Sequence, residues 1–137
     1  MIGVKTTGSV TITQGIRVAV APSYLAEQSE PDEGRYFFGY RIRITNESTE
    51  RVQLMRREWT IIDGDGERAE VEGEGVVGQQ PILEPGQSYV YSSFCPLGTP
   101  WGTMEGWYIF RDHAGEEFRV RIGRFFLVMT REAAADA

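Results

Sequence analysis

Alternation between apolar and polar residues is the feature that most restricts how this chain folds. It is clearest from residue 36 to residue 46, where one side collects Tyr36, Phe38, Tyr40, Ile42 and Ile44. Arg41 and Arg43 fall on the other side. A period of two residues is the spacing of a strand with one buried face. A shift of one residue would place both arginines in the core, so we predict a strand here in a firm register.

The same alternation recurs along the chain, with glycine and proline between the repeats. We predict further strands at 16–21, 52–63, 67–71, 89–94, 104–111, 118–122 and 125–129. Apolar residues on both faces of 52–63 predict partial cover on each side. Residues 22–34 and 95–102 are expected to be loops, and Asp63-Gly64-Asp65-Gly66 is typical of a hairpin turn.

No segment has a helical period. About seven or eight strands, with turn residues between them, predict an all-β fold, an antiparallel two-sheet β-sandwich of the fibronectin type III or immunoglobulin kind. We expect residues 1–15 to form an N-terminal arm or edge strand. The sandwich is expected to occupy residues 16–129, followed by a flexible tail at 130–137.

A second motif, Leu83-x-Pro85-Gly86-x-x-Tyr89, supports the same fold. Pro85 presets its own φ and Gly86 accepts a positive φ, so the pair favours a tight turn. Tyr89 follows at the start of a strand, which is the position of a tyrosine corner. In such a corner the tyrosine hydroxyl bonds back to the preceding backbone. Many fibronectin type III domains carry a similar motif.

Composition limits the partners of the chain. Its 137 residues suit one domain, and Asp+Glu 20 against Lys+Arg 14 gives a net charge of −6. This balance disfavours a nucleic-acid binder, which needs a basic face, and also an anionic membrane surface. The longest apolar run, Phe125 to Met129, is far shorter than a membrane span.

The expected compartment is the cytoplasm. Cys95 is the only cysteine, so no intrachain disulfide can form. The first eight residues lack the apolar centre of a signal peptide. Both features fit a reducing environment.

The central Gly73-x-Gly75-x-x-Gly78 pattern resembles a phosphate-binding loop. A dinucleotide fingerprint needs a helix after the glycines, whereas Pro81 and the Pro-Gly turn that follow cannot begin one. A nest of backbone N–H groups that cups an anion is the remaining functional interpretation, with Gly73, Gly75, Val76, Val77 and Gly78 as its members. Three glutamates, at 70, 72 and 74, would repel phosphate. We therefore expect the glycines to turn the chain across the end of a sheet.

The residues of nucleophilic and metal chemistry are scarce. His113 is the only histidine, and a zinc site needs about four N, S or O ligands. Cys95 has no basic neighbour in sequence to activate its thiol. Asp63 and Asp65 resemble half of a calcium loop, but Glu67 and Arg68 do not continue the pattern. We predict no catalytic residues, no cofactor and no metal site.

Several short motifs occur in an order that resembles the ApaG family. The densest is Val71-x-Gly73-x-Gly75-Val76-Val77-Gly78-x-Gln80-Pro81. The others are Gln28-Ser29-x-Pro31, Tyr36 to Asn46, Arg57-x-Trp59, Pro85-Gly86, Cys95-Pro96-Leu97 and Thr99-Pro100-x-Gly102-x-Met104-x-Gly106. They cover about residues 16 to 128. The chain departs from the family at Glu58, where members more often carry His, and at Trp101, where a smaller residue is more usual.

The resemblance implies a fibronectin type III-like sandwich in a bacterial protein linked to cobalt and magnesium homeostasis. Genes of this family often lie beside that of a diadenosine tetraphosphate hydrolase. Similar domains in eukaryotic F-box proteins and in a DNA polymerase delta-interacting protein look like interaction modules. The family's glycine motif has prompted a pyrophosphate-binding proposal, which here concerns Gly73, Gly75 and Gly78.

Three functions are compatible with these observations. The first is a non-catalytic protein-interaction module that binds a protein partner, with Trp101 as an anchor or a sheet edge that accepts a partner strand or a second copy. A Trp101 folded onto the end of the sandwich is the structural alternative. The second function is a pyrophosphate or nucleotide sensor that uses the glycine loop. The third is a divalent-metal buffer that uses the carboxylates between Asp63 and Glu74.

Overall fold

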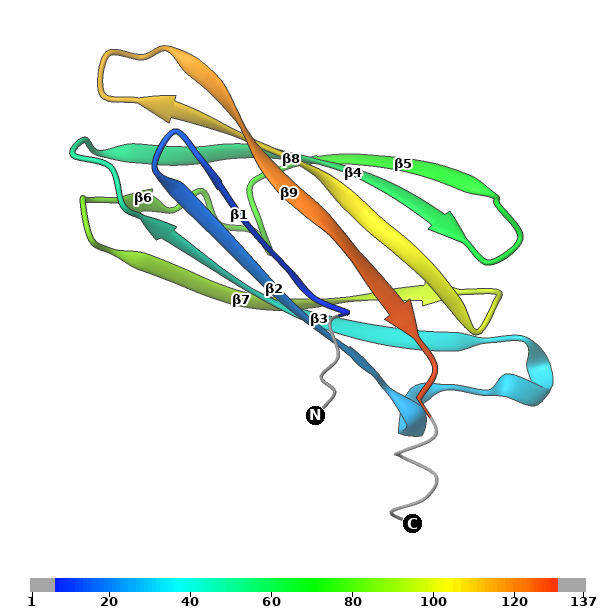
Figure 1. Ribbon diagram of the computed structural model, residues 1–137. Helices are drawn as coiled ribbons and strands as arrows, with labels where there is room; N and C mark the ends of the chain where they lie inside the picture. The colour runs from blue at the N-terminus through cyan, green and yellow to red at the C-terminus, as the bar shows by residue number, and fades with distance from the viewer. Residues whose placement is uncertain (1–6, 131–137) are drawn as a thin grey trace.

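The computed structural model describes residues 7–130, which form two antiparallel sheets packed face to face (Figure 1). The first sheet has the order β1-β2-β3-β7, and its strands are β1 (Ser9–Thr13), β2 (Ile16–Tyr24), β3 (Tyr36–Asn46) and β7 (Ser88–Leu97). The second has the order β5-β4-β8-β9, with β6 beside β4. Its strands are β4 (Val52–Asp63), β5 (Arg68–Glu74), β6 (Ile82–Leu83), β8 (Trp101–Asp112) and β9 (Glu117–Val128).

The predicted all-β sandwich is confirmed. Strands β2-β3-β7 face strands β4-β8-β9, which is the arrangement of the immunoglobulin and fibronectin type III folds. The helical elements of residues 7–130 are two short 3-10 turns, η1 (Ala26–Gln28) and η2 (Pro31–Glu33), and neither is long or apolar enough to span a membrane. The seven or eight predicted strands are nine, because residues 9–13 form an edge strand and the two-residue β6 is too short to recognise. The predicted tail beyond residue 130 and the first six residues of the predicted arm lie outside the described range.

The strands predicted at 118–122 and 125–129 are one strand, β9. Ile122 pairs with Gly106 and Phe125 pairs with Met104, so two residues of β9 lie opposite one residue of β8. Such a bulge inserts one residue and moves the buried positions from even to odd numbers. The alternation is thereby interrupted in the sequence although the strand continues.

A second bulge explains why 52–63 carries apolar residues on both faces. The register of β4 against β8 shifts at Met55, between Leu54 and Arg56. Leu54 is buried before the bulge and Trp59 is buried after it, at 4% exposure. The prediction of partial cover on each side is confirmed after the bulge, where Ile61 on one face and Thr60 and Ile62 on the other are half-buried, and the bulge changes the numbering of the face that packs on the core.

Two predicted loops are shorter than expected. β2 continues through Pro22 to Tyr24. Its partner β1 pairs only with Ile16–Val20, so Pro22 lies beyond the end of β1. A proline is tolerated there because no strand on the β1 side needs its N–H as a donor. The predicted loop at 95–102 is reduced to residues 98–100, because β7 runs to Leu97 and β8 begins at Trp101, and these residues cross from the first sheet to the second.

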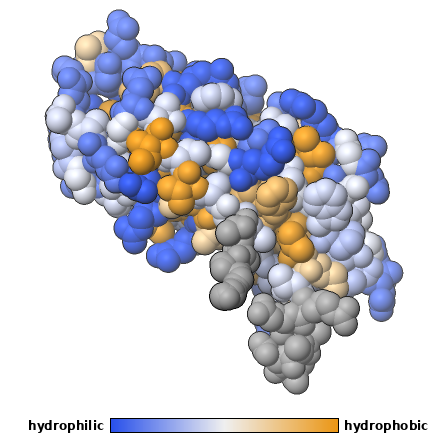
Figure 2. Space-filling model, in the orientation of Figure 1, coloured by the Kyte–Doolittle hydropathy of each residue, from blue (hydrophilic) through white to orange (hydrophobic). Residues whose placement is uncertain are grey.

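The core lies between the sheets and follows the predicted faces. Tyr40, Trp59 and Phe125 meet there with ring centroids 5.6 to 5.8 Å apart. The fully buried large side chains are Tyr108, Phe38, Phe110, Phe125, Ile16, Ile42, Ile44, Leu54, Met104, Ile122, Leu127 and Val18. Figure 2 shows the opposite pattern outside, where apolar side chains are scattered among hydrophilic ones on the side that carries β1 and β9.

Hydroxyl groups close the sandwich along the β1–β9 edge. Ser9 and Thr11 donate their hydroxyls to the backbone carbonyls of Gly123 and Arg121, at 2.9 and 2.7 Å. The Thr13 hydroxyl accepts the Arg121 N–H at 3.1 Å. Gly123 has no Cβ, and a Cβ there would lie 2.8 Å from the Thr11 methyl carbon. Side chains of β1 therefore provide hydrogen-bond partners for backbone groups at the β9 edge.

Candidate functional site

The glycine loop is a tight turn that uses its own backbone donors. Val76 and Gln79 exchange two backbone hydrogen bonds, at 2.8 and 2.9 Å, and the Gly75 N–H donates to the Met55 carbonyl at 2.8 Å. Val77 and Gly78 both have positive φ, 48° and 80°, which is the conformation of a type I′ turn. Gly75 also has a positive φ of 62°. The donors that a phosphate nest would offer are thus already paired at Gly75, Val76 and Gln79.

Gly73 has a different role from Gly75 and Gly78. It has no positive φ, which corrects the expectation that all three glycines turn the chain. A Cβ at Gly73 would lie 2.6 Å from the Arg57 guanidinium carbon, so the missing side chain makes room for that group. Arg57 Nη1 donates to the carbonyls of Glu74 and Gly75, at 3.0 and 2.8 Å. The arginine that could have attracted an anion therefore fastens the loop to β4.

The surroundings of the loop are acidic, as predicted. Glu70, Glu72 and Glu74 are exposed on β5, and Glu70 is paired with Arg68 at 2.7 Å. Val76 is fully buried beneath the turn. The candidate anion-binding residues therefore lie close together, but Val76 is buried, Val77 and Gly78 form the turn, and carboxylates surround the loop.

The Pro-Gly corner is confirmed, but its tyrosine is not the residue that secures it. Gln87 N donates to the Glu84 carbonyl at 3.0 Å, and Gly86 has a φ of 87°, as a type II turn requires. Leu83 is buried in β6. Within residues 7–130 the half-buried Tyr89 hydroxyl makes no hydrogen bond, so the predicted tyrosine-corner bond is wrong.

Asn46 performs the task expected of Tyr89. It is fully buried at the end of β3, and its side-chain amide donates to the carbonyls of Leu83 and Glu50, at 2.9 and 2.8 Å. Its backbone N–H donates to the Gln87 carbonyl at 2.9 Å. Asparagine in a strand-ending Asn-Glu-Ser-Thr sequence is an ordinary turn signal, so the sequence offered no sign of this role.

Buried polar groups inside the sandwich are paired with each other. The hydroxyls of Tyr91 and Tyr108 form a hydrogen bond across the two sheets, and burial raises the pKa of both phenols. Burial also raises the pKa of the Cys95 thiol to about 11. Cys95 is therefore protonated at neutral pH and unsuited to nucleophilic attack.

The carboxylates of the turns accept hydrogen bonds from backbone N–H groups. Asp63 Oδ1 accepts the N–H groups of Asp65 and Glu67, both at 2.9 Å, and this confirms the predicted hairpin turn. His113 lies in an exposed turn with its Nδ1 2.9 Å from Glu50. Within the described residues no three His, Cys, Asp or Glu side chains form a group that could hold a metal ion.

Trp101 lies at the start of β8 and is 46% exposed. Its indole covers the turn after β4, because a Cβ at Gly64 would lie 2.7 Å from the indole nitrogen. The proposed anchor residue is thus partly folded onto the sandwich end and partly accessible.

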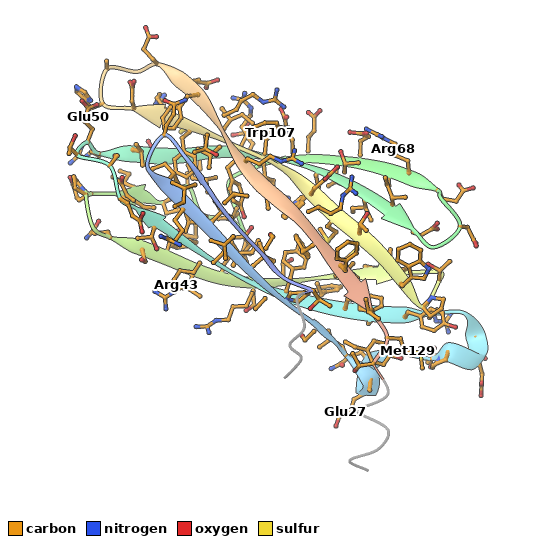
Figure 3. All side chains as sticks on the ribbon, viewed as in Figure 1. Glu27, Arg43, Glu50, Arg68, Trp107 and Met129 are labelled. Carbon is orange, nitrogen blue, oxygen red and sulfur yellow. The ribbon has the colours of Figure 1, made fainter. Side chains whose placement is uncertain are left out.

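The outer face of the second sheet is charged and internally paired. Arg119 and Arg121 lie over the Trp107 ring, 4.3 and 5.1 Å from its centre. Arg119 pairs with Glu58, and Arg121 and Arg124 share Glu105, all at 3.1 Å. The hydrogen bond from Arg124 lowers the pKa of the Glu105 carboxyl. Trp107 points outward on this face (Figure 3).

The outer face of the first sheet has the opposite character. No residue of β1, β2, β3 or β7 is Asp or Glu, although the chain contains 20 of them. Arg17, Arg41 and Arg43 project from this face between small side chains, and Arg43 points away from the core in Figure 3. We call this surface, with Ala19, Ala21 and Val90, the arginine face.

Two cations of the arginine face form no ion pair within the part of the chain that the structure describes. Arg17 pairs with Glu47 at 2.8 Å, whereas Arg41 and Arg43 are exposed and form no ion pair with any residue between 7 and 130. They border a shallow depression of about 210 Å³ that is lined by Ala19, Val20, Ala21 and Val90. This surface was not predicted, although the absence of acids from four segments is visible in the sequence once the strands are assigned to sheets.

Comparison with known proteins places these features in one family. A family model described as the ApaG domain matches residues 26–112. Protein ApaG of Methylobacterium nodulans is 54% identical over 115 residues, which is 84% of this chain and 88% of the relative. Protein ApaG of Brucella canis is 52% identical over 116 residues, 85% of this chain and 89% of the relative.

A solved structure agrees with the fold. The crystal structure of a Bordetella pertussis protein named ApaA matches with a TM-score of 0.82 and 46% identity. The match covers 85% of this chain and 94% of that protein.

Proposed function

The chain belongs to the ApaG domain family, and on this premise we propose that it is a non-catalytic protein-interaction module that binds its partner on the arginine face. The observation that carries the proposal is the pair of exposed arginines, Arg41 and Arg43, which form no ion pair within residues 7–130, on a sheet without acids. The chain has a net charge of −6, so this patch is a region of positive electrostatic potential on an otherwise acidic protein.

The arginine face has the composition of a binding surface. Arginine is enriched in interfaces because its planar group pairs with carboxylates while its stem packs on apolar surface. Next to the arginines, Phe94 is 60% exposed on β7 and stacks on Phe37 with ring centres 6.3 Å apart. Aromatic and arginine side chains are those that most often dominate binding energy.

Catalysis is less well supported. Cys95 is buried with a raised thiol pKa, and the tyrosine hydroxyls of the interior bond to each other. The exposed carboxylates of the turns bind backbone N–H groups. These groups are engaged in holding the fold, so we assign none of them to a reaction.

The pyrophosphate-sensor alternative ranks lower for the same kind of reason. A phosphate at the glycine loop would have to displace the Val76–Gln79 bonds or the contact of Arg57 with the carbonyls of Glu74 and Gly75. The family resemblance implies a link to cobalt and magnesium homeostasis. We propose that this link arises through the protein partner rather than through a metal site in this chain. The single cysteine favours a reducing cytoplasm as the working compartment.

Affinity capture with matched variants tests the proposal. The double variant Arg41→Gln/Arg43→Gln removes two charges from the arginine face, and Arg51→Gln/Arg68→Gln removes two exposed charges elsewhere. We expect a protein that wild type and control variant retain in stoichiometric amount and that the arginine-face variant loses. If all three retain the same proteins, the arginine face is not the binding site.

Titration with pyrophosphate, ATP and adenine dinucleotides tests the alternative. We expect dissociation constants of about 1 mM or weaker. Micromolar binding that Gly78→Ala abolishes while the domain remains folded would favour the sensor.

A further inference from the structure

Five strand edges border the two sheets within residues 7–130, and four of them are protected, one of them because β6 has only two residues. β1 and β9 bridge each other through Ser9, Thr11 and Thr13. β5 carries Arg68 and three glutamates in seven residues. Proteins commonly protect sheet edges in these ways, with charges or with cover from another segment.

β7 is the exception. Its ten residues, SYVYSSFCPL, contain no charge, and Pro96 stands near its end. In the described part of the chain its backbone pairs with β3 alone. Figure 1 shows it at the border of the first sheet, away from β1. A long uncharged edge of this kind is a template for one more strand.

The register identifies which donors the edge offers. Asn46 N donates to the Gln87 carbonyl, and the β3–β7 register continues from there without a shift. Hydrogen bonding alternates along an antiparallel pair, so the odd-numbered residues of β7 bond to β3. The backbone N–H and C=O groups of Val90, Ser92 and Phe94 consequently point away from β3, toward the open edge of the sheet.

The arginine face lies directly beside this edge. Arg43 is opposite Val90, and Arg41 is opposite Ser92. Strands are about 4.8 Å apart, so a long arginine side chain reaches over the short Val90 and Ser92 to the position that an added strand would occupy. The two arginines are two residues apart, about 6.8 Å, and this is the spacing of successive side chains on one face of a strand.

We propose that β7 accepts an extended acidic segment of a partner protein as a tenth strand. Its carboxylates at positions i and i+2 pair with Arg41 and Arg43, and an apolar residue packs on the exposed Phe94. Backbone bonds give the pairing its affinity, and the alternating carboxylates select the partner. This inference rests on the proposed interaction function and specifies its site.

A second copy of the chain fits the edge less well. Pairing of β7 with β7 would bring the Arg41 and Arg43 groups of both copies to one seam, where like charges repel. An acidic segment instead neutralises charges that have no partner between residues 7 and 130.

Peptide binding to the whole chain tests the proposal. The probes are three peptides of about ten residues, the length of β7. The first alternates glutamate and valine, and the second replaces glutamate by lysine. The third keeps the sequence of the first but carries N-methyl groups on four successive central residues, which removes backbone N–H donors from both edges of the peptide. We expect the first to bind at least about tenfold more tightly than the other two at low salt, and less tightly as salt is added. Amide exchange at Val90, Ser92 and Phe94 should slow when it binds.

Variants of the chain locate the binding. Ser92→Pro blocks the edge at a residue whose N–H faces outward, where proline is tolerated, and thermal melting checks its fold. We expect it and Arg41→Gln/Arg43→Gln to weaken binding of the glutamate peptide about tenfold. The control Arg51→Gln/Arg68→Gln should change it less than about twofold.

Several results would overturn the proposal. Equal binding of the N-methylated and unmethylated glutamate peptides would rule out strand addition, and equal binding of the lysine peptide would rule out charge selection. A short single-stranded DNA that competes equally would identify a general polyanion surface. A dimer in sedimentation that Ser92→Pro dissolves would assign the edge to a second copy. If no peptide binds while partner capture still requires Arg41 and Arg43, strand addition is wrong and the interaction function stands.

Discussion

Gly75 and Gly78 share a positive φ but differ in their surroundings. A Cβ at Gly75 would collide with the Gln79 carbonyl, whereas none of the described atoms lies within 4 Å of a Cβ at Gly78. We predict that Gly78→Ala destabilises by about 1 kcal/mol, the cost of a left-handed alanine. Gly75→Ala should cost more than about 3 kcal/mol, because the turn must also open. Urea unfolding measures both. Equal costs would show that the turn adapts, and Gly78→Asn, which tolerates this φ, is the control.

The tyrosines provide a second contrast at the residue scale. Tyr91 and Tyr108 bond to each other in the core, so Tyr108→Phe leaves a buried hydroxyl without its partner. We predict a loss of about 1 to 3 kcal/mol in the free energy of unfolding. Tyr89→Phe should change it by less than about 0.5 kcal/mol, because the Tyr89 hydroxyl has no bond within residues 7–130. A larger effect at Tyr89 than at Tyr108 would restore the tyrosine corner.

At the scale of elements, the β1–β9 edge depends on side chains rather than on a backbone ladder. Thr11→Val keeps the shape of the side chain but removes its bond to the Arg121 carbonyl. We predict that the free energy of unfolding falls by about 1 kcal/mol and that amide exchange in β9 becomes faster. Val10→Thr, at a neighbouring position that is 60% exposed, is the control and should be near neutral. Unchanged exchange in β9 would mean that β1 does not cover this edge in solution.

The elements also show why boundaries were predicted unevenly. β3 runs from Tyr36 to Asn46 as predicted, because nothing interrupts its alternation. β4 and β9 each contain a bulge, at Met55 and beside Gly123, and a bulge reverses which parity is buried. The bulges also have local uses: the Met55 carbonyl receives the Gly75 N–H, and Gly123 allows the approach of Thr11.

At the scale of the whole molecule, buried acidic groups make stability depend on pH. Burial raises the pKa of Cys95 from 9.0 to about 11 and raises the pKa of Tyr91 and Tyr108 above 10.0. The unfolded chain therefore releases protons that the folded chain retains, so these groups leave stability unchanged below about pH 8 and lower it as pH rises from about 9 upward. Urea unfolding between about pH 7 and 11 measures this, and Cys95→Ala together with Tyr91→Phe should flatten the decline. A decline that is unchanged in this double variant would place its origin in other groups.

The charge asymmetry of the molecule emerges only when the strands are grouped into sheets. In the chain, the acid-free segments 9–24, 36–46 and 88–97 are separated by acidic turns and by the strands of the other sheet. Folding brings these segments together and collects Arg41 and Arg43 on one outer face. Composition alone predicted an acidic protein, and this is true of the molecule but not of that surface.

The sequence by itself determined the fold class, the positions of most strands and the face that each buries. These follow from local physics, since a period of two and the turn preferences of glycine, proline and aspartate act between neighbours. Only the tertiary structure decided which groups meet across the sheets: Asn46 with Leu83, Tyr91 with Tyr108, and Arg57 with the glycine loop. It also decided which edge is left open, because the protection of an edge depends on strands that lie far apart in the chain. The candidate site belongs to this second group: β7 and the arginines of β3 become one surface only when residues about fifty positions apart pair in register.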